Sequence, residues 1–125
     1  MNLLNKKSRI YVAGSNGMVG SAICRLLEKK GFSRQMKTLL TTSKKDLDLR
    51  DLNKVEDWFS TNNPDVVVIA AAKVGGIMAN KSKPVDFLIE NLKIQNNLIE
   101  KSFDYGVKKL LFMGSSCIYP KFSKQ

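Results

Sequence analysis

Three glycines at positions 14, 17 and 20 follow a short apolar segment and open an amphipathic one, and this spacing constrains the fold most. The first permits a tight turn, the second lets a ligand approach the backbone, and the third lets a helix pack closely on a strand. The start of that helix presents unpaired N–H groups and a positive dipole end to a phosphate. The stretch therefore predicts a strand–turn–helix unit that binds a dinucleotide pyrophosphate, and a flexible loop is the alternative interpretation.

Apolar periodicity and turn residues predict alternating strands and helices along the rest of the chain. Strands are expected around residues 10–13, 37–42, 65–72 and 108–113, helices around 18–30, 52–61 and 84–105, and a glycine-containing loop at 73–80. This alternation predicts an α/β fold, a partial Rossmann-type doubly wound parallel sheet of about four strands in the order 3-2-1-4. The first and fourth strands would then diverge at the switch point, which would bring residues 14–20 beside residues 114–120.

The residues after the second predicted strand favour NADP(H) over NAD(H). About 20 residues beyond the glycines, a dinucleotide fold meets the adenosine ribose, and an Asp or Glu there holds the 2′-hydroxyl of NAD. Residues 41–45 read Thr-Thr-Ser-Lys-Lys instead, and hydroxyl and ammonium groups suit a 2′-phosphate. A basic surface turn is the alternative interpretation. Asp48 is expected to approach adenine, and Asp51 is expected to cap the next helix.

The predicted cofactor contacts come from four loops at one edge of the sheet. They are Gly14, Ser15, Asn16, Gly17, Met18, Val19, Gly20, Lys44, Lys45, Asp48, Leu49, Ala70, Ala71, Ala72, Met113, Gly114 and Ser116. The three alanines belong to this set because small side chains let a flat cofactor pass close to a strand end.

The long predicted helix at 84–105 carries two apolar stripes. One consists of Val85, Leu88, Ile89, Leu92, Ile99 and Phe103, and the other of Phe87, Ile94 and Leu98. A helix with two apolar stripes must cover two surfaces, its own sheet and a second one. We expect the second stripe, with Phe87 and Leu98, to form a homodimer interface in the complete protein; more of the same chain is the alternative cover.

Composition and charge narrow the remaining possibilities. The net charge of +10 is uneven, because residues 1–50 hold 11 Lys or Arg against 3 Asp or Glu. This excess favours an anionic ligand, although solvated surface lysines are the alternative. The sequence lacks a basic face with base-stacking groups, so it does not indicate nucleic-acid binding. It also lacks an apolar run long enough to span a membrane and a cysteine pattern typical of a metal site. Two widely separated cysteines suggest no disulfide, so a cytoplasmic location is expected.

Three motifs together resemble a known family. They are Gly-Ser-Asn-Gly-Met-Val-Gly-Ser-Ala at 14–22, Ala-Ala-Ala-Lys-Val-Gly-Gly-Ile at 70–77 with Ala-Asn at 79–80, and Gly-Ser-Ser-Cys-Ile-Tyr-Pro-Lys at 114–121. The glycine spacing is typical of short-chain dehydrogenases, and the other two motifs resemble the GDP-L-fucose synthase family of extended short-chain dehydrogenase/reductases. The resemblance runs from about residue 9 to residue 125.

The resemblance implies a function. Members of this family epimerise GDP-4-keto-6-deoxy-D-mannose at C3 and C5 and then reduce its C4 ketone with NADPH, giving GDP-L-fucose. Ser115 matches the hydroxyl that stabilises the developing alkoxide, and Cys117 matches the epimerisation acid/base. On sequence alone, Cys117 would more often be a buried small hydrophobe. The expected partners are a GDP-sugar substrate and a second copy of the chain, with no nucleic acid and no membrane.

The chain departs from the family pattern after the third motif. The family's Tyr-x-x-x-Lys pair should follow that motif, but the sequence ends at Gln125 and contains no histidine. A formal match at Tyr105 and Lys109 precedes the fourth strand, so we expect it at the wrong edge of the sheet. The expected organisation is a disordered lead-in at 1–8 and the N-terminal part of an NADP-binding Rossmann domain at 9–125, with the substrate domain absent and no turnover by this chain alone.

Two other interpretations stay open. The chain could belong to another NAD(P)-dependent sugar-nucleotide epimerase, dehydratase or reductase. It could also be a non-catalytic nucleotide-binding module.

Overall fold

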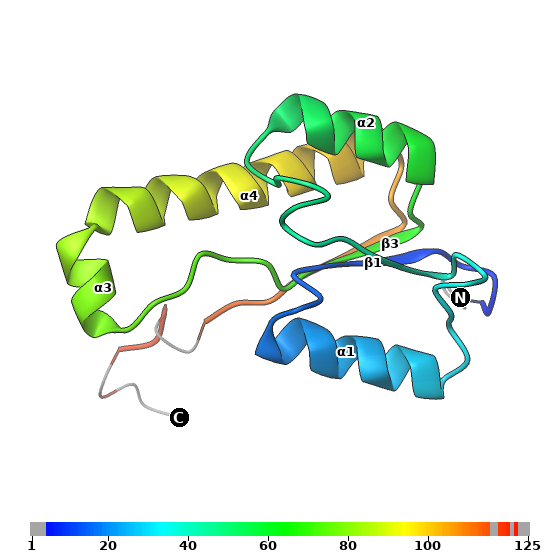
Figure 1. The fold of residues 1–125 in the computed structure, drawn as a ribbon, viewed down its shortest axis with the longest axis horizontal. Coiled ribbons are helices and arrows are strands. Elements are labelled where there is room, and N and C mark those ends of the chain that lie inside the picture. The colour runs from blue at the N-terminus through cyan, green and yellow to red at the C-terminus, as the bar shows by residue number, and fades with distance from the viewer. Residues whose placement is uncertain (1–4, 116–117, 121, 123–125) are drawn as a thin grey trace.

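A computed structural model of the chain describes residues 5–115, 118–120 and 122. It has three layers, a parallel four-stranded sheet with one helix on one face and two helices on the other (Figure 1). The elements are β1 (Ile10–Ala13), α1 (Met18–Lys29), β2 (Leu39–Thr41), α2 (Leu52–Asn62), β3 (Val66–Ile69), α3 (Ile77–Ser82), α4 (Pro84–Asp104) and β4 (Lys109–Phe112). The α/β class and the parallel sheet predicted from the alternation are confirmed.

The strand order differs from the predicted 3-2-1-4. The strands lie in the order β2-β1-β3-β4, so β3 pairs with β1 on the side away from β2. The apolar run of β3 fits this position, because all four of its residues are buried, as is usual for a central parallel strand whose two faces are covered by helices. The predicted order would have placed β3 at the edge, where a strand is less fully covered. The switch point therefore lies between β1 and β3.

This order also corrects the predicted neighbours of the glycine turn. Since β4 pairs with β3 and not with β1, the described residues that follow β4, 113–115, leave the carboxyl edge of the sheet one strand further from the glycine turn than the loop after β3 does. The predicted pairing of the first and fourth strands, on which the placement of residues 114–120 beside residues 14–20 depended, is wrong. The loop that does lie beside the glycine turn is the one after β3, which begins at Ala70.

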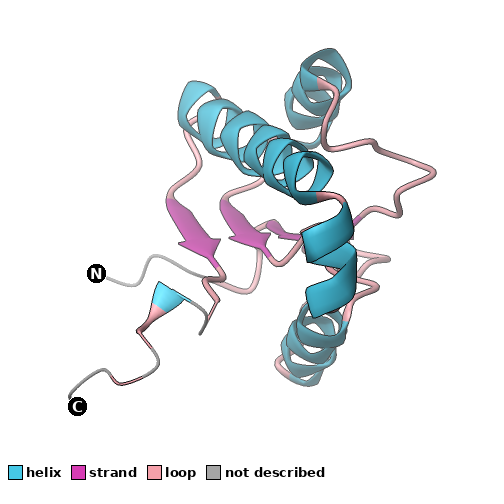
Figure 2. Cartoon of the chain, turned by 90° about the vertical axis from the view of Figure 1, so that its left-hand side faces the viewer, coloured by secondary structure: helices cyan, strands magenta, loops and turns pink. Residues whose placement is uncertain are grey.

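Two apolar clusters fill the spaces between the layers, and Figure 2 shows helices on both faces of the sheet. Under α1, the buried side chain of Cys24 packs with Ile10, Val12 and Val68, which confirms that this cysteine contributes to packing. On the other face, Tyr11, Val55, Phe59, Val67, Ile69 and Leu98 are among the fully buried side chains.

Local signals set the ends of the helices. Asp51 caps α2 as predicted, because its carboxylate accepts a hydrogen bond from the backbone N–H of Lys54 at 3.2 Å. Asn63 ends the same helix in the left-handed conformation. The segment at 73–80, expected to be a loop throughout, contains the start of the short helix α3.

The two apolar stripes of α4 have the opposite roles from those predicted. Leu98 is fully buried and Ile94 packs on the same core, so their stripe covers the sheet. The other stripe is exposed, with Val85 67% and Phe103 86% accessible. The sequence showed both stripes but not which one the sheet covers.

The described part of the N-terminal segment has local structure. Residues 5–8, predicted to be disordered, form a turn in which the backbone N–H of Asn5 bonds Ser8 Oγ at 3.1 Å. Within the residues that the structure describes, no helix is long and apolar enough to cross a membrane.

Candidate functional site

The turn between β1 and α1 is built on backbone contacts that leave no room for a side chain at its first and third glycines. Gly14 has φ +83°, and a Cβ there would lie 2.6 Å from the backbone nitrogen of Ala71. A Cβ on Gly20 would lie 2.1 Å from the carbonyl oxygen of Gly14. These contacts seat α1 on the turn and the turn against the loop after β3. No side chain caps the start of α1, which suits a site where a phosphate takes that place.

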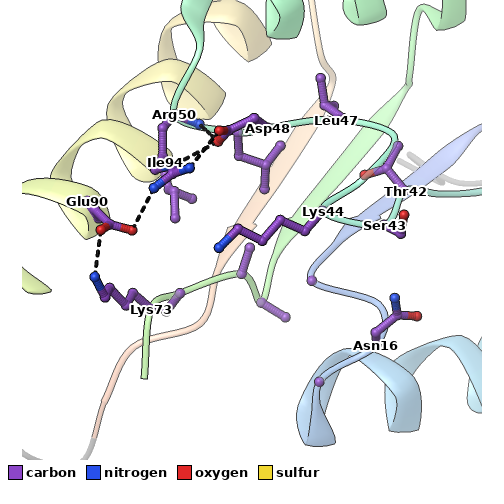
Figure 3. Close-up of a pocket in the computed structure, with 16 residues that line it drawn as sticks. Asn16, Thr42, Ser43, Lys44, Leu47, Asp48, Arg50, Lys73, Glu90 and Ile94 are labelled. Atoms are coloured by element: carbon purple, nitrogen blue, oxygen red, sulfur yellow. Dashed lines mark hydrogen bonds and ion pairs between the residues drawn. The ribbon is translucent and has the colours of Figure 1, made fainter. Parts of the chain in front are cut away.

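A cavity of about 390 Å³ opens at this edge of the sheet (Figure 3). Its lining comes from the glycine turn, the loops after β2 and β3, and one face of α4. The lining residues are Gly14, Asn16, Gly17, Thr42, Ser43, Lys44, Leu47, Asp48, Leu49, Arg50, Ala70, Ala71, Ala72, Lys73, Glu90 and Ile94. A crevice at the carboxyl ends of β1 and β3 is where doubly wound sheets bind their ligands.

The first three residues after β2 supply two hydroxyl groups and one cation to the cavity. Ser43 and Asp46 lock the loop, because the Asp46 carboxylate accepts from the Ser43 hydroxyl at 2.6 Å and from its backbone N–H at 3.0 Å. These bonds lower the pKa of Asp46. Lys44 extends its side chain across the cavity, as Figure 3 shows. Lys45 is not among the lining residues.

A buried tyrosine supports the same loop from below. The hydroxyl of Tyr11 lies 2.7 Å from Thr42 Oγ1, which ties the core of the sheet to the first residue after β2. Burial raises the pKa of Tyr11 to about 12, and the bond to Thr42 opposes that rise. Tyr11 therefore stays protonated and serves as a fixed support.

Four charged side chains form a chain along the wall opposite α1. Arg50 donates from Nε and Nη2 to the two oxygens of Asp48, at 2.9 and 2.7 Å. Its Nη1 donates to Glu90 Oε2 at 3.0 Å, and Lys73 Nζ donates to Glu90 Oε1 at 2.6 Å. Arg50 lowers the pKa of Asp48 mainly through the side-chain hydrogen bonds, and Lys73 does the same for Glu90. Both carboxylates are therefore ionised at neutral pH.

The backbone of Lys73 is held as firmly as its side chain. Its N–H donates to Asn91 Oδ1 at 2.7 Å, and Asn91 Nδ2 donates to its carbonyl oxygen at 3.0 Å. The ring of Phe87 lies 5.2 Å from Lys73 Nζ and also packs against Gly75. Helix α4 thus fixes the residue at which the chain leaves the cavity.

The structure brings together most of the predicted cofactor residues. Those that line the cavity are Gly14, Asn16, Gly17, Lys44, Asp48, Leu49, Ala70, Ala71 and Ala72. Others do not line it: Ser15 is buried beside Thr42, Met18 and Val19 are on the exposed side of α1, Gly20 lies under the turn, and Lys45 is on the surface.

The loop after β4 carries the remaining predictions. Met113, Gly114 and Ser115 follow β4 at the carboxyl edge and do not line the cavity. Ser116 and Cys117 lie outside the described residues. The sequence-based prediction missed Arg50, Lys73 and Glu90, although Lys73 lies within the motif at 70–77. Among the described residues, no group of three or more His, Cys, Asp or Glu side chains could hold a metal ion.

The rejected Tyr-x-x-x-Lys match lies where the sequence predicted. Tyr105 ends α4, and its ring packs 6.0 Å from that of Phe59 in the core. Lys109 begins β4 at the amino edge of the sheet, opposite the cavity. This pair therefore cannot act at the site.

The parallel sheet, the glycine turn and the cavity at the switch point define a Rossmann-type nucleotide-binding domain. Residues 10–125 match the family described as "NAD dependent epimerase/dehydratase family", and the chain belongs to it.

Relatives narrow the resemblance. The chain is 50% identical over 123 residues to "Putative GDP-L-fucose synthase 2" of Arabidopsis thaliana, covering 98% of this chain and 36% of the relative. It is 48% identical over 119 residues to "GDP-L-fucose synthase" of Escherichia coli, covering 95% and 36%. A GDP-D-glycero-L-gluco-heptose synthase from Campylobacter jejuni, solved in the presence of NADPH, superposes with a TM-score of 0.88 at 38% identity, covering 97% and 34%.

These matches confirm the resemblance predicted from the three motifs. The chain spans about a third of the length of the relatives that it matches.

Proposed function

We propose that the chain binds NADP(H) and forms the cofactor-binding part of a GDP-4-keto-6-deoxy-D-mannose epimerase-reductase, a GDP-L-fucose synthase. The observation that carries this proposal is the cavity at the β1/β3 switch point, bounded by the glycine turn and by the side-chain-poor residues Ala70–72. The similarity to named GDP-L-fucose synthases supports the substrate. The solved heptose synthase supports NADPH as the cofactor.

The loop after β2 supports NADP(H) over NAD(H). Thr42, Ser43 and Lys44 line the cavity, and no carboxylate occupies the first positions after the strand. Lys44 is the cation of this group that extends into the cavity, so we assign it to the 2′-phosphate. An acidic side chain there would repel that phosphate.

The bound cofactor would supply the hydride that reduces the C4 ketone. Within this chain, the start of α1 would hold the pyrophosphate, and Asp48 with Leu49 would contact adenine. We assign Ser115 to the carbonyl oxygen and Cys117 to proton exchange at C3 and C5, as the family motif implies.

We further propose that the isolated chain does not turn over. The 125 residues contain no histidine and no Tyr-x-x-x-Lys pair after β4. The exposed stripe of α4 and the exposed residues of β4 need further cover, and for α4 we assign a second copy of the chain in a homodimer. We also propose a cytoplasmic location, because the two widely separated cysteines suggest no disulfide.

Calorimetry on the 125-residue chain tests the cofactor proposal. NADPH is expected to bind with a 1:1 stoichiometry, and NADH at least about tenfold more weakly, because it lacks the phosphate that Lys44 binds. Equal affinities would contradict the NADP(H) assignment, and binding of neither would contradict the proposed site.

A second candidate is another GDP-sugar reductase, which the heptose synthase supports at 38% identity. Substituting Cys117 in the full-length protein separates the two. Loss of C3/C5 proton exchange with ketone reduction retained would favour the epimerase-reductase, and unchanged exchange would favour the alternative.

A further inference from the structure

The four charged residues along the cavity wall connect segments that are far apart in the sequence. Asp48 and Arg50 belong to the loop after β2, Lys73 follows β3, and Glu90 lies on α4 (Figure 3). Their contacts run in one line, from Asp48 through Arg50 and Glu90 to Lys73. All four side chains are partly buried, between 25 and 35% exposed, so water screens these contacts less than on an open surface.

Arg50 restricts Asp48 to one orientation. Three donors reach the same carboxylate: Nε and Nη2 of the guanidinium, and the backbone N–H of Arg50 at 3.0 Å. A bidentate guanidinium fixes a carboxylate plane as a single ammonium group cannot. The remaining lone pairs of Asp48 then face fixed directions within the lining of the cavity.

Helix α4 in turn fixes Arg50 and the segment that carries it. Glu90 accepts from Arg50 Nη1 on one oxygen and from Lys73 on the other. About two helical turns further along α4, Asn97 Nδ2 donates to the carbonyl oxygen of Leu49 at 2.9 Å. The loop after β2 is therefore tied to α4 at two consecutive residues, once through a side chain and once through the backbone.

We infer that Arg50 and Glu90 are positioning residues that fix Asp48 as a hydrogen-bond acceptor for the 6-amino group of an adenine ring. This inference rests on the proposed binding of NADP(H). An ionised carboxylate accepts but does not donate, so it selects a base with an amino group at that position. Arg50 supplies the orientation, and Glu90 keeps Arg50 and Lys73 on the wall.

Two nucleotides that differ at one position test this selection. NADPH carries adenine, and its hypoxanthine analogue carries a 6-oxo acceptor in place of the amino donor. The unsubstituted chain is expected to bind NADPH at least about tenfold tighter, because two acceptors would face each other in the analogue complex. In Arg50→Met, the ratio of the two affinities should fall to about threefold or less, because Asp48 can rotate. Glu90→Gln should lower the same ratio by a smaller factor.

Controls separate positioning from general support of the fold. A merely structural role would weaken both nucleotides equally and leave the ratio unchanged. Arg34→Met removes an arginine paired with Glu28 outside the cavity, and it should retain the ratio of the unsubstituted chain. Arg50→Lys keeps the positive charge but cannot make the bidentate bond to Asp48, so it should also lower the ratio of the two affinities. This variant provides the test if Arg50→Met does not fold.

A measurement without nucleotide tests the same restraint. Hα–Hβ couplings of Asp48 in the free chain should show one χ1 rotamer, and averaged couplings in Arg50→Met. Averaged couplings in the unsubstituted chain, or an unchanged affinity ratio in both Arg50 variants, would overturn the inference. If the chain bound both nucleotides equally, the inference alone would fail; if it bound neither, the proposed function would fail with it.

Discussion

Replacing Gly20 by alanine should destabilise the fold through a single contact. The added Cβ would lie 2.1 Å from the carbonyl oxygen of Gly14 and 2.7 Å from its carbonyl carbon, whereas real Cβ contacts essentially never fall below 3.0 Å. Both of these atoms are backbone, so no side chain can rotate away. Helix α1 would have to move off the turn by roughly 1 Å, and packed interiors do not absorb such a shift without cost.

The magnitude follows from the packing. Overfilling a packed site costs about 1–3 kcal/mol, and a clash with backbone lies at the upper end, so we expect about 3 kcal/mol. For a chain of this length, that loss lowers the melting temperature by about 10 °C. Circular dichroism at 222 nm during heating measures the shift, and urea unfolding measures the free energy.

Gly17 offers a matched control in the same turn. A Cβ there would lie 3.4 Å from the Gly14 oxygen, an ordinary contact, and φ is −77°. Gly17→Ala should therefore change the unfolding free energy by less than about 1 kcal/mol. A Gly20→Ala variant that melts within about 2 °C of the unsubstituted chain would refute the reasoning, as would equal losses in the two variants.

Three further predictions address the cofactor, the core and pH. Lys44→Met should weaken NADPH binding about tenfold or more in calorimetry, while Lys45→Met, outside the cavity, should change it less than about twofold; equal effects would contradict the 2′-phosphate assignment. Leu98→Ala should cost about 2–5 kcal/mol in urea unfolding, because Leu98 is fully buried, and a loss below about 1 kcal/mol would contradict its place between α4 and the sheet. Asp65 accepts from the backbone N–H of Arg9 and from Lys108, each at 2.8 Å, and these bonds lower its pKa, the first most. Because the folded pKa lies below the unfolded value of 3.8, its contribution is complete well above pH 3.8 and is lost as the pH falls through the folded pKa. The stability advantage over Asp65→Asn should thus be constant between about pH 6 and 7 and shrink below about pH 4, and an advantage that grew in acid would contradict this sign.

Much of the fold could be predicted from local patterns. The glycine spacing, the period of the apolar residues in α1 and α4, and the Asp51 cap each depend on a few neighbouring residues. Helix α1 begins at Met18 and α4 begins at Pro84, as expected. Local rules decide these features, so the sequence reports them directly.

The strand order and the roles of the α4 stripes depend on contacts between distant segments. A right-handed crossover permits β3 on either side of β1, and only the burial of β3 on both faces favours the centre. The apolar run at 65–72 indicates that burial, but it does not indicate which strands lie on either side. The two stripes of α4 are similarly apolar, and only the packing of Leu98 against the sheet decides between them.

The lining of the cavity was predicted only where it follows strand ends, because the rest depends on contacts between distant segments. Lys44, Asp48 and Ala70–72 follow strand ends, so the position of a parallel strand predicts them. Glu90 lies within α4, and a charged residue in a helix is on sequence alone most simply interpreted as solvated. It reaches Arg50 and Lys73 only because α4 crosses the carboxyl edge of the sheet.

The most direct test of the central claim is an NMR titration of the ¹⁵N-labelled chain with NADPH. The account predicts that the largest amide shift changes will occur at residues 14–18, 42–50 and 70–73, which meet around the β1/β3 switch point. Saturation without changes at these residues, or the largest changes at the amino edge of the sheet around Tyr105 and Lys109, would contradict it.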